Sequence, residues 1–241
     1  MVPPRRVQGV GVTDPEREIA LAPSILAADL GHLADQVRAA DRGGAAMIHV
    51  DVMDGRFVPE ITIGPAITRA VREATRLPLD VHLMIVEPER HLASFAKAGA
   101  SRLAVHVEVC PHLYQTLHEI KVLGCEATVA LNPATTPEQV EWVLPAVSTV
   151  LVMTVEPGAG GQPFIPEMLS KVRALADRRR VLGLAFDIEV DGGIGPATAA
   201  AVVEAGATIL VAGSAVFGAP EGIAAAIARL REAARAARAR P

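Results

Sequence analysis

The sequence is poor in several features that would indicate other classes of protein. Only 3% of the 241 residues are aromatic, two are cysteine, and the 23 lysines and arginines are outnumbered by 27 aspartates and glutamates. A net charge of −4 provides no overall positive field for nucleic acid or anionic lipid, so any bound anion must be held locally. Two cysteines are too few for a disulfide framework. The sequence also contains no run of about 18 apolar residues, the length needed to span a membrane. We therefore expect a cytoplasmic protein that binds neither nucleic acid nor membrane.

The N-terminal residues 1–18 also lack the apolar stretch of a signal peptide. They are rich in proline, glycine and charge and show no periodicity, so we interpret them as a flexible extension. The whole chain is 51% hydrophobic with a mean hydropathy of +0.33. A chain of this size can bury roughly three quarters of its unfolded surface without a disulfide or metal to hold its core. The sequence thus predicts one globular domain over residues 19–241.

Within that domain, β-branched or apolar runs alternate with amphipathic segments rich in alanine and leucine. Eight strand and helix pairs at a spacing of about 27 residues are typical of a single α/β TIM (β/α)8 barrel of the phosphate-binding type. The predicted strands are residues 19–26, 45–53, 77–85, 101–109, 125–132, 148–156, 185–192 and 207–214. A doubly wound open sheet is the alternative, but its phosphate loop should follow the first strand, where APSILAAD has no glycine.

Metal-ligating side chains are concentrated at the ends of three predicted strands. Alternate residues of a strand share a face, so His49 and Asp51 point together toward the barrel axis, and His82 and Asp191 end two other strands. Burying these groups is costly unless a metal ion or a hydrogen-bonded pair compensates for the lost hydration. The convergence from three strands favours one divalent ion, for which zinc, iron, manganese and cobalt are candidates.

The other histidines are expected to lie elsewhere. His106 falls within a predicted strand and is interpreted as a core residue. The remaining ones fall on predicted helices or loops and are expected in solvent: His32, His91, His112 and His118.

A second group of residues indicates anion binding. The sixth strand leads into Glu156-Pro157-Gly158-Ala159-Gly160-Gly161-Gln162, whose backbone N–H groups can form a concave nest for a phosphate. Gly192-Gly193 and Gly213-Ser214 follow the seventh and eighth strands, where barrels of this type commonly hold phosphate. None of these loops contains lysine or arginine, so we expect the backbone to hold the anion.

Six stretches together resemble the ribulose-phosphate 3-epimerase family. They are APSILAAD, HVDVMDGRFVP, DVHLM, EPGAGGQ, VDGGI and AGSAVF, in this order between residues 22 and 217. The resemblance implies a TIM barrel that interconverts D-ribulose 5-phosphate and D-xylulose 5-phosphate with a divalent metal. QPFIPEMLSK and the preceding MTV also resemble the related allulose 6-phosphate 3-epimerases, which leaves a six-carbon substrate as the alternative.

The resemblance also assigns roles to individual residues. It implies His49, Asp51, His82 and Asp191 as metal ligands, and Asp51 and Asp191 as the acid and base. Inverting a carbon next to a ketone requires proton removal from one face and return to the other, which suits two carboxylates. The implied substrate-binding residues are Ser24, Met53, His82, Met84, Met153, Gly158, Ala159, Gly160, Gly161, Gln162, Gly192, Gly193, Gly213 and Ser214.

Three positions depart from the family pattern. Glu60 and Glu156 stand where the family usually has asparagine, and Ala159 stands where it usually has phenylalanine. We expect these differences to alter the rim of the pocket and not the metal centre, and the smaller Ala159 bears on the length of the substrate.

Three other interpretations fit the sequence less well. A lyase or decarboxylase on the same barrel often uses an added lysine, and none of the inward strand ends has one. A phosphosugar-binding protein without activity would not need four metal-type residues. Arginines near the C-terminus could contact nucleic acid or membrane, but the spacing of Ile223, Ile227 and Leu230 predicts the last barrel helix instead. The partner expected from the sequence is a small phosphorylated ketose, and self-association into a homo-oligomer is left open.

Overall fold

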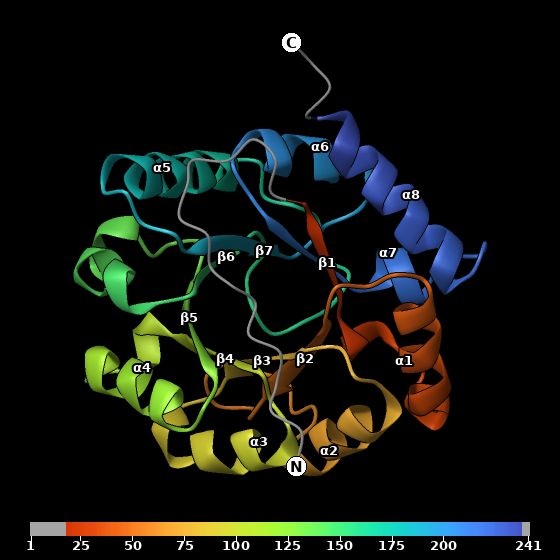
Figure 1. Ribbon diagram of the computed structural model, residues 1–241, viewed down its shortest axis with the longest axis horizontal. Helices are drawn as coiled ribbons and strands as arrows, with labels where there is room; N and C mark the ends of the chain where they lie inside the picture. Colours follow the sequence, from red (N-terminus) through yellow and green to blue (C-terminus); the bar gives the residue numbers. More distant parts are fainter. Residues whose placement is uncertain (1–17, 238–241) are drawn as a thin grey trace.

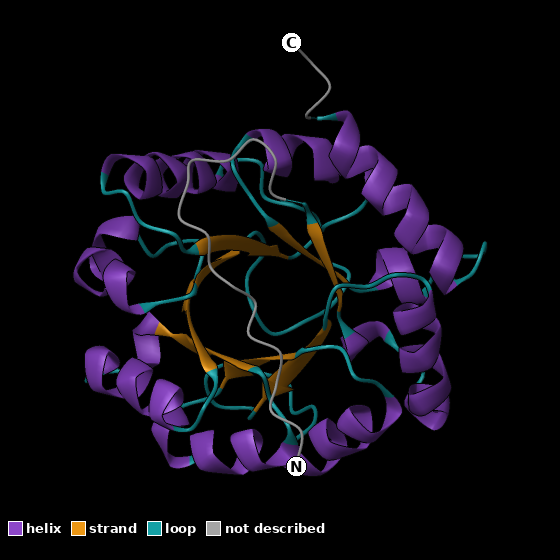
Figure 2. Ribbon diagram, viewed as in Figure 1, coloured by secondary structure: helices purple, strands orange, loops and turns teal. Residues whose placement is uncertain are grey.

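The computed structural model describes residues 18–237, which form a barrel of eight parallel strands (Figure 1). Hydrogen-bonded neighbours follow the order β1-β8-β7-β6-β5-β4-β3-β2. The first and second strands close the ring through the backbone N–H of Ala46, which donates to the carbonyl of Leu21 at 2.9 Å, and through a parallel bridge between Ser24 and His49. Helices surround the strands on the outside (Figure 2). The predicted TIM barrel is confirmed.

All eight predicted strand segments contain a strand. The strands are β1 (Ala20–Pro23), β2 (Ile48–Met53), β3 (Leu79–Met84), β4 (Arg102–His106), β5 (Glu126–Leu131), β6 (Thr149–Met153), β7 (Asp187–Asp191) and β8 (Ile209–Ala212). The α-helices are α1 (Leu33–Arg42), α2 (Pro65–Ala74), α3 (Leu92–Ala98), α4 (Leu113–Val122), α5 (Met168–Val181), α6 (Pro196–Glu204), α7 (Ser214–Phe217) and α8 (Ile223–Ala236).

The fifth strand–helix unit differs from the regular pattern. Its connection is a 3-10 helix, Pro137–Ala146, which contains Pro145. Proline has no backbone N–H and its ring clashes with the preceding turn, so a regular α-helix cannot continue through Pro145. Further 3-10 turns lie in the loops at Ile25–Ala27, Leu30–His32, Pro88–Arg90 and Val107–Val109.

The strands present opposite faces to two kinds of surroundings. Outward residues such as Val50 and Val52 belong to the large apolar core between strands and helices, which also includes Val37 of α1 and Val71 of α2. Inward residues of the same strand include His49 and Asp51, which are 0% and 3% exposed. This alternation places the chemically active side chains inside the barrel, on strands fixed by apolar packing on their other face.

The N-terminal end of the barrel carries a separate ionic cluster. Arg102, at the start of β4, pairs with Glu126 of β5 at 2.6 Å and lies 3.8 Å from Asp187 of β7. In a TIM barrel this end serves stability, because the reactive groups lie at the C-terminal ends of the strands. Arg102 also acts electrostatically on the buried Asp80 of β3 and Glu189 of β7.

The structure also bears on the cysteines and the chain ends. Cys110 follows β4 and Cys125 precedes β5, and both are free and buried, with thiol pKa values raised by burial to about 12 and about 11.

The expected last barrel helix is α8, which packs against α6 and α1. Of the predicted extension, residues 1–17 lie outside the described residues. No helix between residues 18 and 237 has both the length and the apolar character for a membrane crossing.

Candidate active site and metal centre

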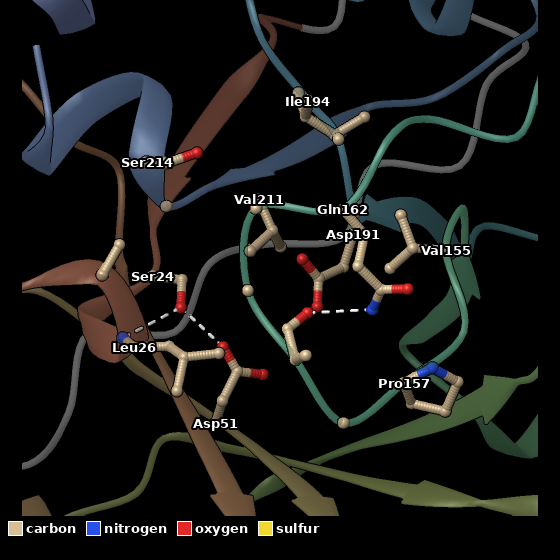
Figure 3. Close-up of a pocket in the computed structure, with 18 of the residues that line it drawn as sticks. Ser24, Leu26, Asp51, Val155, Pro157, Gln162, Asp191, Ile194, Val211 and Ser214 are labelled. Carbon is tan, nitrogen blue, oxygen red and sulfur yellow. Dashed lines mark hydrogen bonds between the residues drawn. The ribbon is translucent and has the colours of Figure 1, made fainter.

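A cavity of about 690 Å³ opens at the C-terminal end of the barrel (Figure 3). The two candidate acid/base residues, Asp51 and Asp191, line it. So does every predicted substrate-binding residue except His82, namely Ser24, Met53, Met84, Met153, Gly158, Ala159, Gly160, Gly161, Gln162, Gly192, Gly193, Gly213 and Ser214. His49 and His82 are fully buried beside this lining and face Asp51. The exposed histidines are those expected in solvent: His32, His91, His112 and His118.

The four nominated metal ligands form one cluster. One ligand atom from each of His49, Asp51, His82 and Asp191 can be chosen so that all lie within 4.8 Å of one another. Oδ1 of Asp51 lies 3.2 Å from Nε2 of His49 and 3.1 Å from Nδ1 of His82. Oδ2 of Asp191 lies 3.9 Å and 3.8 Å from the same two nitrogens. Two imidazole nitrogens and two carboxylates of this kind suit a divalent transition metal.

Carboxylates on the far side of His49 orient its ring. Its Nδ1 lies 2.9 Å from Oδ2 of Asp80 and 3.3 Å from Oε1 of Glu189, both fully buried. A proton on Nδ1 can therefore be donated outward, which leaves the electron pair of Nε2 directed at the cluster. That Nε2 is buried and has no hydrogen-bond partner, and an unpaired buried nitrogen is costly unless a ligand occupies its electron pair.

The two candidate acid/base aspartates have different electrostatic surroundings. Burial alone would raise the pKa of Asp51, but the neighbouring imidazoles, His49 first and then His82, lower it below its usual value in the metal-free protein. The pKa of Asp191 is raised to about 7, first by burial and then by the neighbouring charge of Asp51. In the metal-free protein near neutral pH, one carboxylate is thus ionised while the other can hold a proton.

Ser24 ties Asp51 to the first loop of the barrel. Its hydroxyl donates to Oδ2 of Asp51 at 2.5 Å and accepts a hydrogen bond from the backbone N–H of Leu26 at 3.2 Å (Figure 3). Oδ1 of Asp51 thereby remains directed at the two histidines. Figure 3 shows Asp51 and Asp191 reaching the same part of the cavity from different strands.

Some glycines of the glycine-rich loops occupy positions that larger residues would not tolerate. Gly193 has φ of +64°, and a Cβ there would lie 2.6 Å from the backbone nitrogen of Phe164. The side-chain amide of Gln162 donates to the carbonyls of Glu156 and Ala159 at 2.6 Å and 3.0 Å, so it holds the loop in shape. At the eighth strand, Gly213 precedes α7, whose first N–H groups have no partner within the helix.

Two of the three departures from the family pattern reach the cavity. Glu60 and Ala159 line it, whereas the lining residues do not include Glu156. The cavity lining contains no lysine or arginine. An anion entering here would meet backbone N–H groups and small side chains.

Sequence reasoning missed the residues behind the ligands. Asp80 and Glu189 contact His49, and His106, interpreted only as a core residue, lies 2.8 Å from His82 through their Nε2 atoms. Glu108 follows, 3.2 Å from Nδ1 of His106. The alternation that located the ligands could have found Asp80 and Glu189, because each stands two residues before a predicted ligand on the same strand face.

Comparisons with known proteins show the family of the chain. A family model described as the ribulose-phosphate 3 epimerase family matches residues 20–217. The chain belongs to the ribulose-phosphate 3-epimerase family. It is 53% identical to a ribulose-phosphate 3-epimerase of Synechocystis sp. over 221 residues, covering 91% of this chain and 96% of that protein. It is also 54% identical to the Bacillus subtilis protein of that name over 203 residues, with coverage of 83% and 93%.

Solved structures outside the family share the fold. A 3-hexulose-6-phosphate synthase is 20% identical with a TM-score of 0.63, covering 90% of this chain and 99% of that one. A thiamine phosphate pyrophosphorylase from Pyrococcus furiosus is 16% identical with a TM-score of 0.61, covering 92% and 98%. At these identities the likeness supports the barrel, while the chemistry must be argued from the residues of this family member.

Proposed function

We propose that this protein is a metal-dependent epimerase that inverts C3 of D-ribulose 5-phosphate to give D-xylulose 5-phosphate. The observation that supports this most is the meeting of Asp51 and Asp191 with two buried histidines at the base of a glycine-rimmed cavity. The chain's membership of the epimerase family supports the same reaction. Such a role fits the cytoplasmic location expected from the sequence.

The residues present fit a divalent metal ion. His49 and His82 offer nitrogens and Asp51 and Asp191 offer oxygens, and the orphaned Nε2 of His49 needs an electrophile to be satisfied. When bound, zinc, iron, manganese or cobalt would supply electrostatic stabilisation of the negative charge that develops on the substrate oxygens. These four side chains are therefore the proposed ligands.

The two aspartates would divide the proton transfers between the faces of C3. One carboxylate takes the proton from C3, and the electron pair of the broken C–H bond moves into an enediolate. The other, protonated, carboxylic acid returns a proton to the opposite face, and the ketone re-forms. In the metal-free protein the pKa of Asp51 is lowered and that of Asp191 is raised, so the two carboxylates differ in their affinity for a proton. The roles exchange in the reverse direction.

Three buried methionines would keep water from the reacting carbon. Met53, Met84 and Met153 line the cavity and are 4%, 1% and 2% exposed. Their thioethers are apolar and adaptable, so they can pack against a sugar without competing for its protons. Excluding water also strengthens the electrostatic interactions of the carboxylates.

The phosphate would bind at the glycine rim. The loops Gly158–Gln162, Gly192–Gly193 and Gly213–Ser214 line the side of the cavity formed by β6, β7 and β8. Their small residues let backbone N–H groups approach an anion closely. Ser214 begins α7, so its first turn adds unpaired N–H groups.

The direct test is turnover of the purified protein on D-ribulose 5-phosphate and D-allulose 6-phosphate measured side by side. We expect the larger kcat/KM for the five-carbon substrate. A preference for the six-carbon substrate would assign the protein to the allulose 6-phosphate 3-epimerases, for which Ala159 in place of phenylalanine would provide space. Failure to epimerise either compound with any of the four metals would overturn the proposal.

A further inference from the structure

A chain of side chains leads from His82 away from the cavity, and the mechanism above does not use it. Nε2 of His82 lies 2.8 Å from Nε2 of His106, and Nδ1 of His106 lies 3.2 Å from Oε2 of Glu108. The two imidazoles stack with ring centroids 5.0 Å apart, and both are fully buried. β4 ends at His106, and Glu108 lies in the 3-10 turn that follows. The chain thus joins the metal cluster to a carboxylate that is 21% exposed.

Donors on its far side fix Glu108 as an acceptor. Its Oε1 accepts from the backbone N–H of Asn132 at 2.8 Å and from the hydroxyl of Thr135. Partial burial raises the pKa of Glu108, but hydrogen bonds from His106, Thr135 and Asn132 outweigh this effect and bring the pKa to about 2. Lys171 holds the same loop by donating to the carbonyl of Asn132 at 2.7 Å. Oε2 therefore presents an ionised acceptor to His106.

Each contact in this chain has room for one proton, so the direction of one hydrogen bond fixes the next. With Glu108 as the acceptor, neutral His106 donates from Nδ1, and its Nε2 must accept from Nε2–H of His82. The tautomer of His82 that this geometry requires has its one proton on Nε2. Its remaining electron pair lies on Nδ1, 3.1 Å from Oδ1 of Asp51 and 3.8 Å from Oδ2 of Asp191. An electron pair facing two carboxylates is stabilised by a cation.

We propose that His106 and Glu108 are positioning residues that hold His82 in the tautomer able to ligate a metal ion, and that they thereby set the metal affinity of the site. The proposal rests on the proposed function only for the assignment of His82 as a ligand. His49 is held in its own metal-binding tautomer by a direct contact with a carboxylate, because its Nδ1 lies 2.9 Å from Oδ2 of Asp80. Partners of this kind typically contribute about 10–100-fold to metal affinity.

The sharpest variant is Glu108→Gln, which keeps the size of the side chain. The donors at Asn132 and Thr135 require an oxygen on their side, so the new amide turns its NH2 group toward Nδ1 of His106. His106 must then donate from Nε2, and the proton of His82 moves to Nδ1, where it blocks a metal ion. We expect a loss of about 10–100-fold in Co²⁺ affinity, measured for the full chain by competition with a chromophoric chelator.

Two companion variants separate positioning from a general loss of structure. Glu221→Gln also removes one paired carboxylate, but outside the barrel beside Arg229 of α8, and should leave Co²⁺ affinity unchanged. The double variant His106→Gln/Glu108→Gln should bind Co²⁺ more tightly than Glu108→Gln alone. In the double variant the amide introduced at position 106 can rotate and offer its oxygen to Nε2–H of His82, whatever stands at position 108.

Nitrogen NMR of the histidine rings in the Zn²⁺-loaded wild type tests the proposal without any variant. The expected tautomers are Nδ1–H for His106 and Nε2–H for His82. An Nε2–H tautomer for His106 overturns the proposal. So does a folded Glu108→Gln variant whose Co²⁺ affinity lies within twofold of wild type, or a double variant whose losses simply add. If the His82→Ala variant binds Co²⁺ as tightly as the wild type does, His82 is not a metal ligand. That result would remove the metal assignment, and the proposed function with it.

Discussion

The proposed metal cluster and the proposed phosphate-binding rim, formed by Gly158–Gln162, Gly192–Gly193 and Gly213–Ser214, lie at the same end of the barrel but are built from different parts of the chain. The cluster consists of side chains on β2, β3 and β7, whose opposite faces pack in the apolar core. The rim consists of backbone in the loops after β6, β7 and β8, where glycines replace side chains. Position is thus fixed by strand register in the cluster and by loop conformation in the rim.

This difference separates the two functions along the chain. Strand residues cannot shift without disturbing the core, which suits groups that must meet within a few tenths of an ångström. Loops can be altered with less cost to the fold, so the rim can change with the substrate while the chemistry stays the same. Changes in strands should therefore reduce metal affinity or kcat, and changes in loops should mainly raise KM.

The largest effect is expected from His82→Ala, which removes a ligand from the cluster. Because an outer partner alone contributes about 10–100-fold to metal affinity, loss of the ligand itself should cost more than ~100-fold. Metal content after dialysis and Co²⁺ affinity measure this. His118→Ala on the exposed face of α4 serves as the matched control. Undiminished metal in His82→Ala would exclude the proposed ligand set.

Asp191→Asn tests the other strand-borne function. The new amide is nearly the same size and can still offer an oxygen to a metal, but it cannot act as a base. We expect kcat to fall by at least ~100-fold while some metal and substrate binding remain. Exchange of the C3 proton with deuterated solvent, without epimer formation, would support one aspartate serving each face. A near wild-type rate with normal metal content would contradict this division.

Ser24→Ala tests the boundary between the two regions, because Ser24 lies in a loop and its hydroxyl contacts the carboxylate of Asp51 on a strand. Losing the hydrogen bond from Ser24 to Asp51 should raise the activation free energy by about 1.5 kcal/mol. This lowers kcat about tenfold and changes KM little. Steady-state kinetics with saturating metal separate the two constants. Ser170→Ala, whose hydroxyl donates to a backbone carbonyl on the exposed side of α5, is the control. An effect confined to KM would place Ser24 with the rim instead.

The smallest effect is expected from Gly160→Val in the rim. A Cβ there meets only Leu26, at 3.7 Å or more, so the fold should tolerate the change. Loss of about one backbone contact to phosphate, near 1 kcal/mol, should raise KM about fivefold for the phosphorylated ketose and leave its unphosphorylated analogue unaffected. Gly64→Val is the control, since a Cβ at Gly64 meets nothing within 4 Å and Gly64 lies outside the cavity lining. Equal losses for both ketoses would remove the phosphate assignment from this loop.

The same comparison explains what the sequence could predict. Alternation along β2 placed His49 and Asp51 on one inward face, and the barrel topology brought His82 and Asp191 to the same end, as the structure confirms. The glycine loops could be located from composition, but the conformation of Gly193 depends on the backbone of Phe164, about 30 residues away in sequence and recognisable only in three dimensions.

The residues behind the proposed ligands, His106 and Glu108, were harder to predict from the sequence. His106 has an ordinary place on an inward strand face, and nothing local distinguishes a filler histidine from one that meets His82. Glu108 lies in a turn, where its contact with the loop at Asn132 depends on how β4 and β5 are placed beside each other. Likewise, the proline that replaced the fifth helix with a 3-10 helix is visible in the sequence, but the choice among shorter connections depends on packing.

The absence of basic side chains from the cavity lining has a kinetic consequence. Lysine and arginine would attract a phosphate dianion across several ångströms of water, with a force that dissolved salt screens. Backbone N–H groups act at contact, so a rim of this kind selects its substrate by shape after the encounter rather than by accelerating the encounter. Turnover at low substrate concentration should then respond little to ionic strength. The product, which has the same charge as the substrate, leaves without having to break an ion pair.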